Sequence, residues 1–195
     1  MKLFVGGVGL AAALVTTISA PATAGTSEPE TTTRAAVQTV GVAVDTLPEV
    51  GRSAVPVVCF RGHVEDIGWQ GWDCDDDGSW AFAGTISQFR RLEALQVVAY
   101  GTGGGTCAQA HVQDYGWRPQ VCVADGVVAQ VGTTGEFRRI EAIGFGSSSL
   151  GSCAEAHVQD YAWMGYKCTG AGQVNVVGTT GEFRRMEAVT GTILQ

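Results

Sequence analysis

The sequence lacks the features that mark membrane, nucleic-acid-binding and hydrolytic proteins. After the first 24 residues, no stretch of the 195-residue chain is long and apolar enough to cross a bilayer. Positive charge is scarce, because 12 Lys and Arg stand against 19 Asp and Glu, for a formal net charge of −7. Binding to nucleic acid or anionic lipid depends on Lys and Arg meeting phosphates, so we expect no nucleic-acid partner and no membrane. A Gly-x-Ser-x-Gly nucleophile motif is also missing.

Histidine is equally scarce, and its three copies all stand in one repeated phrase. The phrase reads GHVEDIGW at 62–69, AHVQDYGW at 110–117 and AHVQDYAW at 156–163. A hydrolytic triad needs a nucleophile, a His and a carboxylate in one cleft, and no Ser or Thr accompanies the histidine in all copies. We therefore predict a non-catalytic protein with structural histidines, a ligand-binding histidine in each copy being the alternative. These residues are His63, His111 and His157.

Residues 1–24 have the composition of a secretory signal peptide. One lysine precedes an apolar run, and a small-x-small pattern ends it at Ala24. The run is short for a membrane anchor and has no basic flank after it. Removing it takes away Lys2 and leaves a net charge of −8 (−7 minus +1). We expect a secreted, extracellular chain of about 170 residues, enough for one domain with a core.

The six cysteines occur as three pairs with the same spacing of 15 residues. Export implies an oxidising compartment, where thiols pair. Six cysteines allow 15 pairings, and the repeated spacing favours three identical loops, each contributing about 3 kcal/mol. A zinc site is the alternative, since each first Cys precedes a His by four residues. Zinc needs four clustered ligands, so we expect no metal and no cofactor. The predicted disulfides are Cys59–Cys74, Cys107–Cys122 and Cys153–Cys168.

The histidines and cysteines belong to a longer unit that is written three times. It reads Cys-x3-His-Val-(Glu/Gln)-Asp-x-(Gly/Ala)-Trp-x4-Cys, followed by Gly-Thr and Phe-Arg-Arg-x-Glu-Ala. The landmarks shift by 48 and then 46 residues, and insertions are confined to the joins at 101–106 and 144–152. Such periodicity indicates a repeat architecture. We place a domain at 57–195, with repeats at about 57–98, 99–144 and 145–193.

Each repeat has the composition of β-strands punctuated by glycine. In the first copy we predict four strands, near 58–65, 69–74, 80–85 and 89–98. Alternation along the last strand places Phe89, Arg91 and Glu93 on one face, where Arg91 can pair with Glu93. One such unit is too small to bury its apolar face. We therefore expect an all-β domain in which three units close around a pseudo-threefold axis, as a β-trefoil or a β-prism rather than an open solenoid.

The tryptophans fall into a repeated and an unrepeated set. Trp69, Trp117 and Trp163 recur in every copy, and we predict that they pack in the core of the repeat beside the disulfide. Trp72 and Trp80 occur only in the first copy. An exposed indole can stack on a sugar or anchor a protein partner, so these two are candidates for surface binding.

The stretch DCDDDGSW at 73–80 offers hard oxygen ligands that suit calcium. No Glu follows at the distance that closes a calcium loop, and the other copies have ADG or TGAG at this point. We therefore interpret the stretch as an acidic hairpin turn.

Residues 25–56 lie outside the repeats. TSEPETTTR is polar and predicts disorder. The residues after it alternate valine with small side chains, as a strand does. We interpret the segment as an extended arm that adds to a partner as a strand or threads a cleft, a linker or extra strand of its own domain being the alternative. Its predicted partner-binding residues are Val37, Val40, Val42, Val44 and Leu47.

The HVQDxGW phrase, the Gly-Thr pair and the RxEA block resemble the hydrophobic repeats with a conserved tryptophan known as ChW repeats. The resemblance covers about 57–193. It implies a secreted bacterial protein with an extracellular binding function rather than catalysis. The cysteine pairs and the doubled arginine depart from that pattern and suggest a disulfide-stabilised branch.

The arm together with the disulfide-bearing body resembles, in architecture, the adaptor subunit of secreted umbrella toxin particles. In those antibacterial assemblies the adaptor's arm inserts into a cleft of a lectin-bearing subunit, and its body grips the stalk protein of a large toxin. The resemblance implies a protein-binding adaptor with these two kinds of partner. A lectin-like module that binds cell-wall glycan through three equivalent sites is the other hypothesis.

Overall fold

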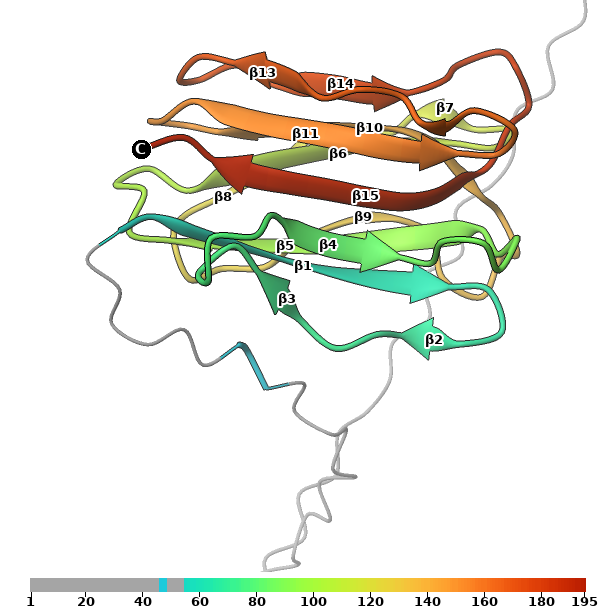
Figure 1. Cartoon of the computed structure of the whole chain (residues 1–195), viewed down its shortest axis with the longest axis horizontal. Coiled ribbons are helices and arrows are strands. Elements are labelled where there is room, and N and C mark those ends of the chain that lie inside the picture. Colours follow the sequence, from blue (N-terminus) through green and yellow to red (C-terminus); the bar gives the residue numbers. More distant parts are fainter. Residues whose placement is uncertain (1–45, 49–54) are drawn as a thin grey trace, which may run out of the picture. The chain divides into compact units, whose positions relative to one another are not determined.

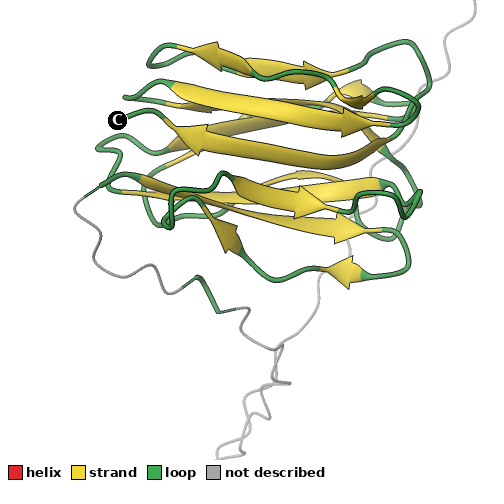
Figure 2. Ribbon diagram, viewed as in Figure 1, coloured by secondary structure: helices red, strands yellow, loops and turns green. Residues whose placement is uncertain are grey.

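The computed structural model describes residues 46–48 and 55–195, and residues 55–195 form an all-β body (Figures 1 and 2). The predicted signal peptide lies outside these residues, as do Val37, Val40, Val42 and Val44 of the predicted arm. Leu47 is described and is 45% exposed. In the described part of the chain, no helix is long and apolar enough to cross a membrane.

The described residues contain fifteen strands, which follow one order three times. The first unit contains β1 (Val57–Val64), β2 (Gly68–Trp69), β3 (Asp73–Cys74), β4 (Ala81–Gly84) and β5 (Leu92–Tyr100). The second contains β6 (Thr106–Val112), β7 (Gly116–Trp117), β8 (Val121–Val123), β9 (Ala129–Gly132) and β10 (Ile140–Ser147). The third contains β11 (Ser152–Val158), β12 (Ala162–Trp163), β13 (Lys167–Thr169), β14 (Asn175–Gly178) and β15 (Met186–Ile193). The predicted strand at 69–74 is therefore two short strands, separated where Gln70 turns aside to bond Gly84.

These strands form three antiparallel five-stranded sheets, each of which borrows one strand from another unit. β9 of the second unit pairs with β5, and β14 of the third unit pairs with β10. β4 of the first unit pairs with β15 of the third. No sheet closes on itself, yet no unit completes its sheet alone. This exchange of strands agrees with the expectation that one unit is too small to bury its apolar face alone.

The apolar side chains of all three units meet in one core. At its centre Phe60 and Phe145 pack edge to face, with ring centroids 5.1 Å apart. Their counterparts in the other units are smaller, namely Ala108, Ala154, Val97 and Gly191. A Cβ added to Gly191 would lie 2.8 Å from the Phe60 ring. Two large rings therefore fill space that the alanines and glycine at equivalent positions leave, as close packing requires.

All three predicted disulfides are present, and the structure has no free cysteine in its described part. Each bond joins residues that lie directly opposite one another, Cys59 and Cys74 between β1 and β3 for example. The bond thus fixes a strand of only two or three residues to the long strand beside it. Strands this short form few hydrogen bonds with their neighbour, so the disulfide holds them in place where a longer strand would be held by its hydrogen bonds.

The glutamate of the RxEA block forms a β-bulge, which corrects the predicted strand at 89–98. In the β1–β5 ladder, Val64 pairs with Leu92 and His63 pairs with Ala94, so Glu93 has no residue opposite. The strand begins at Leu92, and the strict alternation expected along 89–98 is interrupted at Glu93. A bulge redirects one side chain and bends the strand. Glu141 and Glu187 occupy the same place in the other units.

The bulge is also where one unit holds the next. The backbone carbonyl oxygen of each bulge glutamate accepts a hydrogen bond from the backbone N–H of a threonine. This threonine directly follows the strand that the neighbouring unit contributes to the sheet. The bonds are Thr133 to Glu93 at 2.9 Å, Thr179 to Glu141 at 3.0 Å and Thr85 to Glu187 at 2.9 Å. The glycine before each threonine has a positive φ, 110° at Gly84, and a Cβ there would lie 2.3 Å from the Glu187 oxygen. The repeated Gly-Thr pair is therefore the docking point between units.

Candidate functional site

Each bulge glutamate is held between a histidine and an arginine. In the first unit His63 Nδ1 lies 3.1 Å from Glu93 Oε2, and Arg91 Nε donates to Glu93 Oε1 at 2.9 Å. His63 is within ion-pair distance but out of line for a hydrogen bond. The glutamates are only 4–5% exposed, so their charge needs these partners. The other clusters are His111–Glu141–Arg139 and His157–Glu187–Arg185.

The repeated tryptophans pack on these histidines rather than in the core. Trp69, Trp117 and Trp163 meet His63, His111 and His157 edge to face, with centroids 5.3–5.4 Å apart. Trp117 and Trp163 are nevertheless 41% and 36% exposed. This corrects the expectation of a buried ring, because each tryptophan ends a two-residue strand at a sheet edge, and the histidine covers only one side of the ring.

The phenylalanine of each FRR sequence is the most exposed aromatic residue of its unit. Phe89, Phe137 and Phe183 are 76%, 77% and 79% exposed. All three have a positive φ, between 56° and 58°. A bulky side chain in this left-handed region costs on the order of 1 kcal/mol, and these rings recover little by burial. Sequence analysis missed them as site residues, although their recurrence before a doubled arginine was visible.

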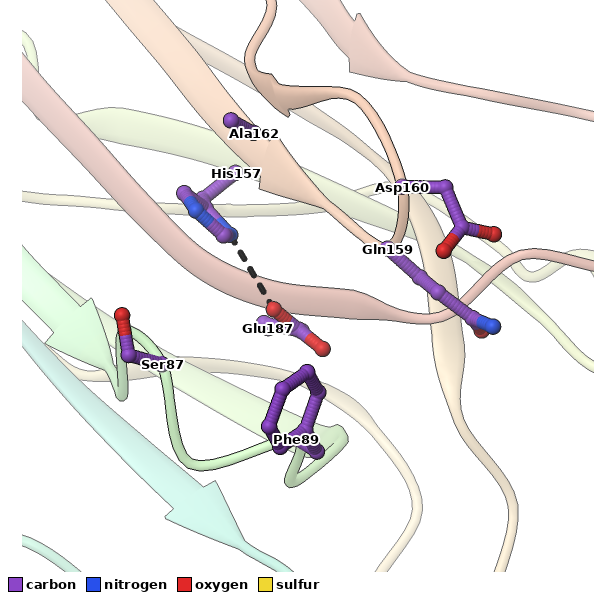
Figure 3. Close-up of a pocket in the computed structure, with 7 residues that line it drawn as sticks. All are labelled: Ser87, Phe89, His157, Gln159, Asp160, Ala162 and Glu187. Carbon is purple, nitrogen blue, oxygen red and sulfur yellow. Dashed lines mark ion pairs between the residues drawn. The ribbon is translucent and has the colours of Figure 1, made fainter.

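The exposed Phe89 lies beside the histidine cluster of the third unit. Figure 3 shows Phe89 and Ser87 of the first unit beside His157, Gln159, Asp160, Ala162 and Glu187 of the third, around a shallow pocket of about 330 Å³. The threonine bonds to Glu93 and Glu141 place the other loops in the same relation to their neighbours. We therefore expect Phe137 over the first unit's cluster and Phe183 over the second's.

Arginine–aspartate pairs flank the phenylalanines. Arg138 pairs with Asp114, and Arg184 pairs with Asp160. The Arg138 guanidinium also covers the ring of Tyr115 at 4.3 Å, as Arg184 covers Tyr161. Arg90 and Asp66 form the pair of the first unit, at 2.9 Å. The carboxylates of these clusters thus have cationic partners, and the surface between them presents aromatic rings.

The residues around the pocket of Figure 3 are only partly repeated in the other units. Ser87 has glycine counterparts there, Gly135 and Gly181, so its hydroxyl is not shared by the three units. The part of the chain that the structure describes contains no group of three or more His, Cys, Asp or Glu arranged for a metal ion. The pocket combines the exposed ring of Phe89 with amide, carboxylate and imidazole groups of the third unit.

The two unrepeated tryptophans are half-buried. The Trp72 ring lies 5.6 Å from the Arg61 guanidinium, and its Nε1 is buried. Trp80 meets Tyr166 of the third unit edge to face, with centroids 5.8 Å apart. Trp80 therefore belongs to a surface that the sequence alone did not assemble, since its neighbour lies in another unit.

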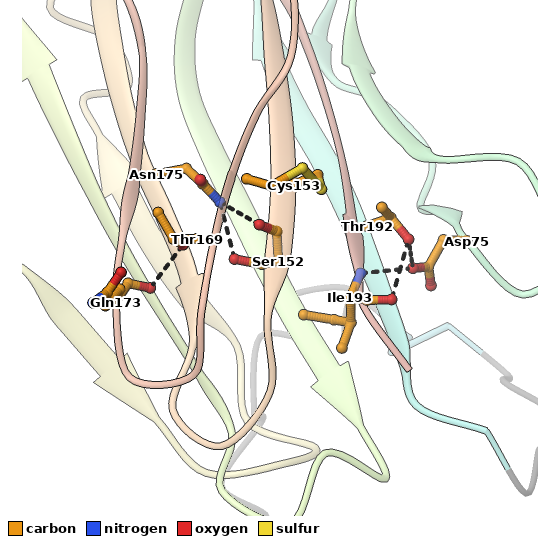
Figure 4. The surroundings of a disulfide bond; sticks show 9 residues. Asp75, Ser152, Cys153, Thr169, Gln173, Asn175, Thr192 and Ile193 are labelled. Carbon is orange, nitrogen blue, oxygen red and sulfur yellow. Dashed lines mark hydrogen bonds between the residues drawn. A yellow bond between two sulfur atoms is a disulfide. The ribbon is translucent and has the colours of Figure 1, made fainter.

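The acidic stretch that suggested calcium is engaged by protein groups. Asp75 Oδ1 accepts a hydrogen bond from the Val58 N–H at 2.7 Å. Its other oxygen accepts from Thr192 Oγ1 at 2.8 Å and the Ile193 N–H at 3.2 Å (Figure 4). Asp77 caps Ser79 within the turn. These bonds support the acidic-turn interpretation and tie the first unit to the last strand.

Fold and sites together define a disulfide-bonded all-β protein built from repeats that share their strands. The family described as ChW, Clostridial hydrophobic W, matches residues 63–99 and 111–145. These segments run from the histidine to the strand that carries the bulge, so the first two units are similar to ChW repeats. The third unit has the same motifs and strand order but lies outside the matched residues. No curated protein and no solved structure matches the chain.

Proposed function

We propose that the protein is a secreted, non-catalytic adaptor that links two partners in an extracellular assembly, through its N-terminal arm and its three-unit body. An antibacterial toxin particle of the umbrella type, with a lectin-bearing subunit and a stalk protein as partners, is the assembly that the architecture resembles. Three disulfides suit an oxidising, extracellular environment. The cyclic borrowing of strands supports a prism-like closure about a pseudo-threefold axis.

The observation that carries the binding role of the body is the set of three exposed phenylalanines. Each sits on strained backbone at an equivalent place, and strain with exposure at one position in every unit is typical of a contact residue. Aromatic rings flanked by arginine are also the side chains that dominate protein interfaces. Binding of a protein through the three phenylalanines accounts for both their exposure and their strained backbone.

Affinity purification from the native secretome tests the adaptor proposal with two variants. Deleting residues 25–52 should abolish capture of one partner and leave the body folded. Changing Phe89, Phe137 and Phe183 together to Ser should abolish capture of the other partner. Val127→Ser, at a site that is 49% exposed, is the control and should leave both captures intact. Unchanged capture by both main variants would reject the proposal.

A lectin-like role is the second candidate, and the pocket of Figure 3 favours it. Since Asp160 and Glu187 are each paired with a cation, a neutral sugar with many hydroxyls suits the pocket better than a charged ligand. Stacking on Phe89 would orient the sugar ring. A glycan array and a cell-wall pull-down decide this point, because retention at high protein concentration is required of a lectin and not of an adaptor.

A further inference from the structure

The first and third units meet at a seam where no chain segment connects them, and aromatic side chains gather there. β4 of the first unit pairs with β15 of the third. Across this seam Trp80 meets Tyr166, and Phe82 meets Trp163 with centroids 6.4 Å apart. Tyr166 remains 67% exposed and Met164 42%. We call this surface the seam patch, made of Trp80, Phe82, Trp163, Met164 and Tyr166.

The seam patch occurs once on a body whose other features occur three times. The residues at the equivalent places of the other junctions are mostly smaller or polar. Between the second and first units they are Val128, Gln130, Trp69, Gln70 and Trp72. Between the third and second units they are Val174, Val176, Trp117, Arg118 and Gln120. Repeat architecture alone does not require five large apolar groups at one junction, and closing the seam does not require a tyrosine that is mostly exposed.

Negative charge lies beside the seam patch. Asp73 Oδ1 accepts the backbone N–H of Phe82 at 3.2 Å, so its carboxylate lies beside the strand that carries Phe82 and directly follows Trp80. Burial raises the pKa of Asp73, and the charges of Asp77 and Asp76 raise it further. Within 70–82 and 160–169 the one Lys or Arg is Lys167, which donates to the Val176 carbonyl oxygen at 3.0 Å. The patch thus combines aromatic faces with carboxylates that repel one another.

We propose that the seam patch binds a lysine- or arginine-bearing segment of a protein partner, one segment per body. A guanidinium or ammonium group is attracted both to the face of an aromatic ring and to a carboxylate. The apolar stem of such a side chain can cover Met164 and the rings. A single patch on a three-unit body would therefore set a one-to-one stoichiometry that the three phenylalanine sites cannot set. This site stands whether or not the phenylalanines bind a partner.

Titration of the full chain with a short peptide of alternating arginine and serine, followed by NMR, tests the proposal. We expect the indole N–H signals of Trp80 and Trp163 to shift in a saturable and salt-sensitive way. The matched peptide with citrulline in place of arginine should shift them far less. Equal shifts with both peptides, a response at Trp117 instead, or no saturable shift would each overturn the proposal.

Variants separate binding from seam stability. Tyr166→Gln copies the residue that stands at Gln120, and we expect it to weaken peptide binding at least about fivefold. Because Tyr166 is mostly exposed, thermal unfolding should change little. Asp76→Asn with Asp77→Asn should weaken binding similarly and reduce its salt dependence. Gln120→Ser is the control at the equivalent place and should leave binding unchanged. Full binding by Tyr166→Gln would overturn the proposal.

Discussion

The seam between the first and third units differs from the two junctions where the chain runs on, although all three share one docking geometry. Each junction has the threonine N–H bonded to a bulge carbonyl and a glycine pressed against the bulge. At the seam Asp75 also accepts bonds from Thr192 and Ile193, the Thr190 hydroxyl donates to the Ala81 carbonyl, and Phe82 packs on Trp163. No connecting segment keeps these two units near each other, and bringing distant parts of the chain together costs chain entropy, which the side-chain contacts offset.

Substitution of the docking glycines should have the largest effect on stability, and the effect should be the same at the seam as at the other junctions. Gly84→Ala and Gly132→Ala each put a Cβ within 2.3–2.4 Å of a backbone oxygen at positive φ. We expect each to lower the free energy of unfolding by about 3 kcal/mol, measured by urea denaturation. Gly71→Ala, where a Cβ meets nothing within 4 Å, is the control. A much smaller loss at one of the two docking glycines would show that the three junctions are not equivalent.

The added seam contacts should show the next largest effect and only at the seam. Asp75→Ala leaves the Val58 and Ile193 N–H groups without their acceptor. We expect a loss of about 2–3 kcal/mol in the free energy of unfolding, with hydrogen exchange accelerated along β15. Val123→Ala, at the equivalent place of the second unit, should cost clearly less because Val123 forms no such tie. Equal losses would mean that the seam needs no special closure.

The pH dependence of stability should report on the same aspartate. Burial raises the pKa of Asp75 above its ordinary value of 3.8, more than its hydrogen bonds lower it. The folded state therefore binds the proton more tightly than the unfolded chain. The stability that protonation provides is present below the unfolded pKa and is lost as pH rises through the folded pKa. Urea denaturation across this acidic range should show a decline that Asp75→Asn lacks, and an identical decline in both proteins would assign it to other groups.

Substitution of the exposed phenylalanines should have the smallest effect on stability, and the change should favour the folded state. Phe137→Gly removes an exposed ring from a left-handed backbone position. We expect unfolding free energy to rise or stay level, within about 1 kcal/mol, while partner binding falls. Leu92→Gly, a fully buried residue three places after Phe89, is the contrasting variant and should unfold the body. A strongly destabilised Phe137→Gly would show that the ring packs rather than binds.

Local patterns in the sequence predicted much of the body. Equal spacing predicted the three disulfides, and β-rich composition punctuated by glycine predicted the strands. The Arg91–Glu93 pair was predicted from residues two apart and is present at 2.9 Å. The pair lies at a bulge rather than along a regular strand. The bulge was not predicted, because hydrophobic alternation does not reveal where one strand has an extra residue. The left-handed backbone conformation of Phe89 was also not predicted, since a positive φ is rarely expected of phenylalanine.

By itself the sequence determined the repeat, its cysteine pairing and the residues that meet within one unit, because those interactions depend on short spacings along the chain. Tertiary structure alone decided which unit lends a strand to which, that Phe89 stands over His157, and that Trp80 and Phe82 join Trp163 and Tyr166. These are contacts between units, and three nearly identical units carry no local signal of the order in which they associate. Only the burial of a common core, with all three present, selects that order.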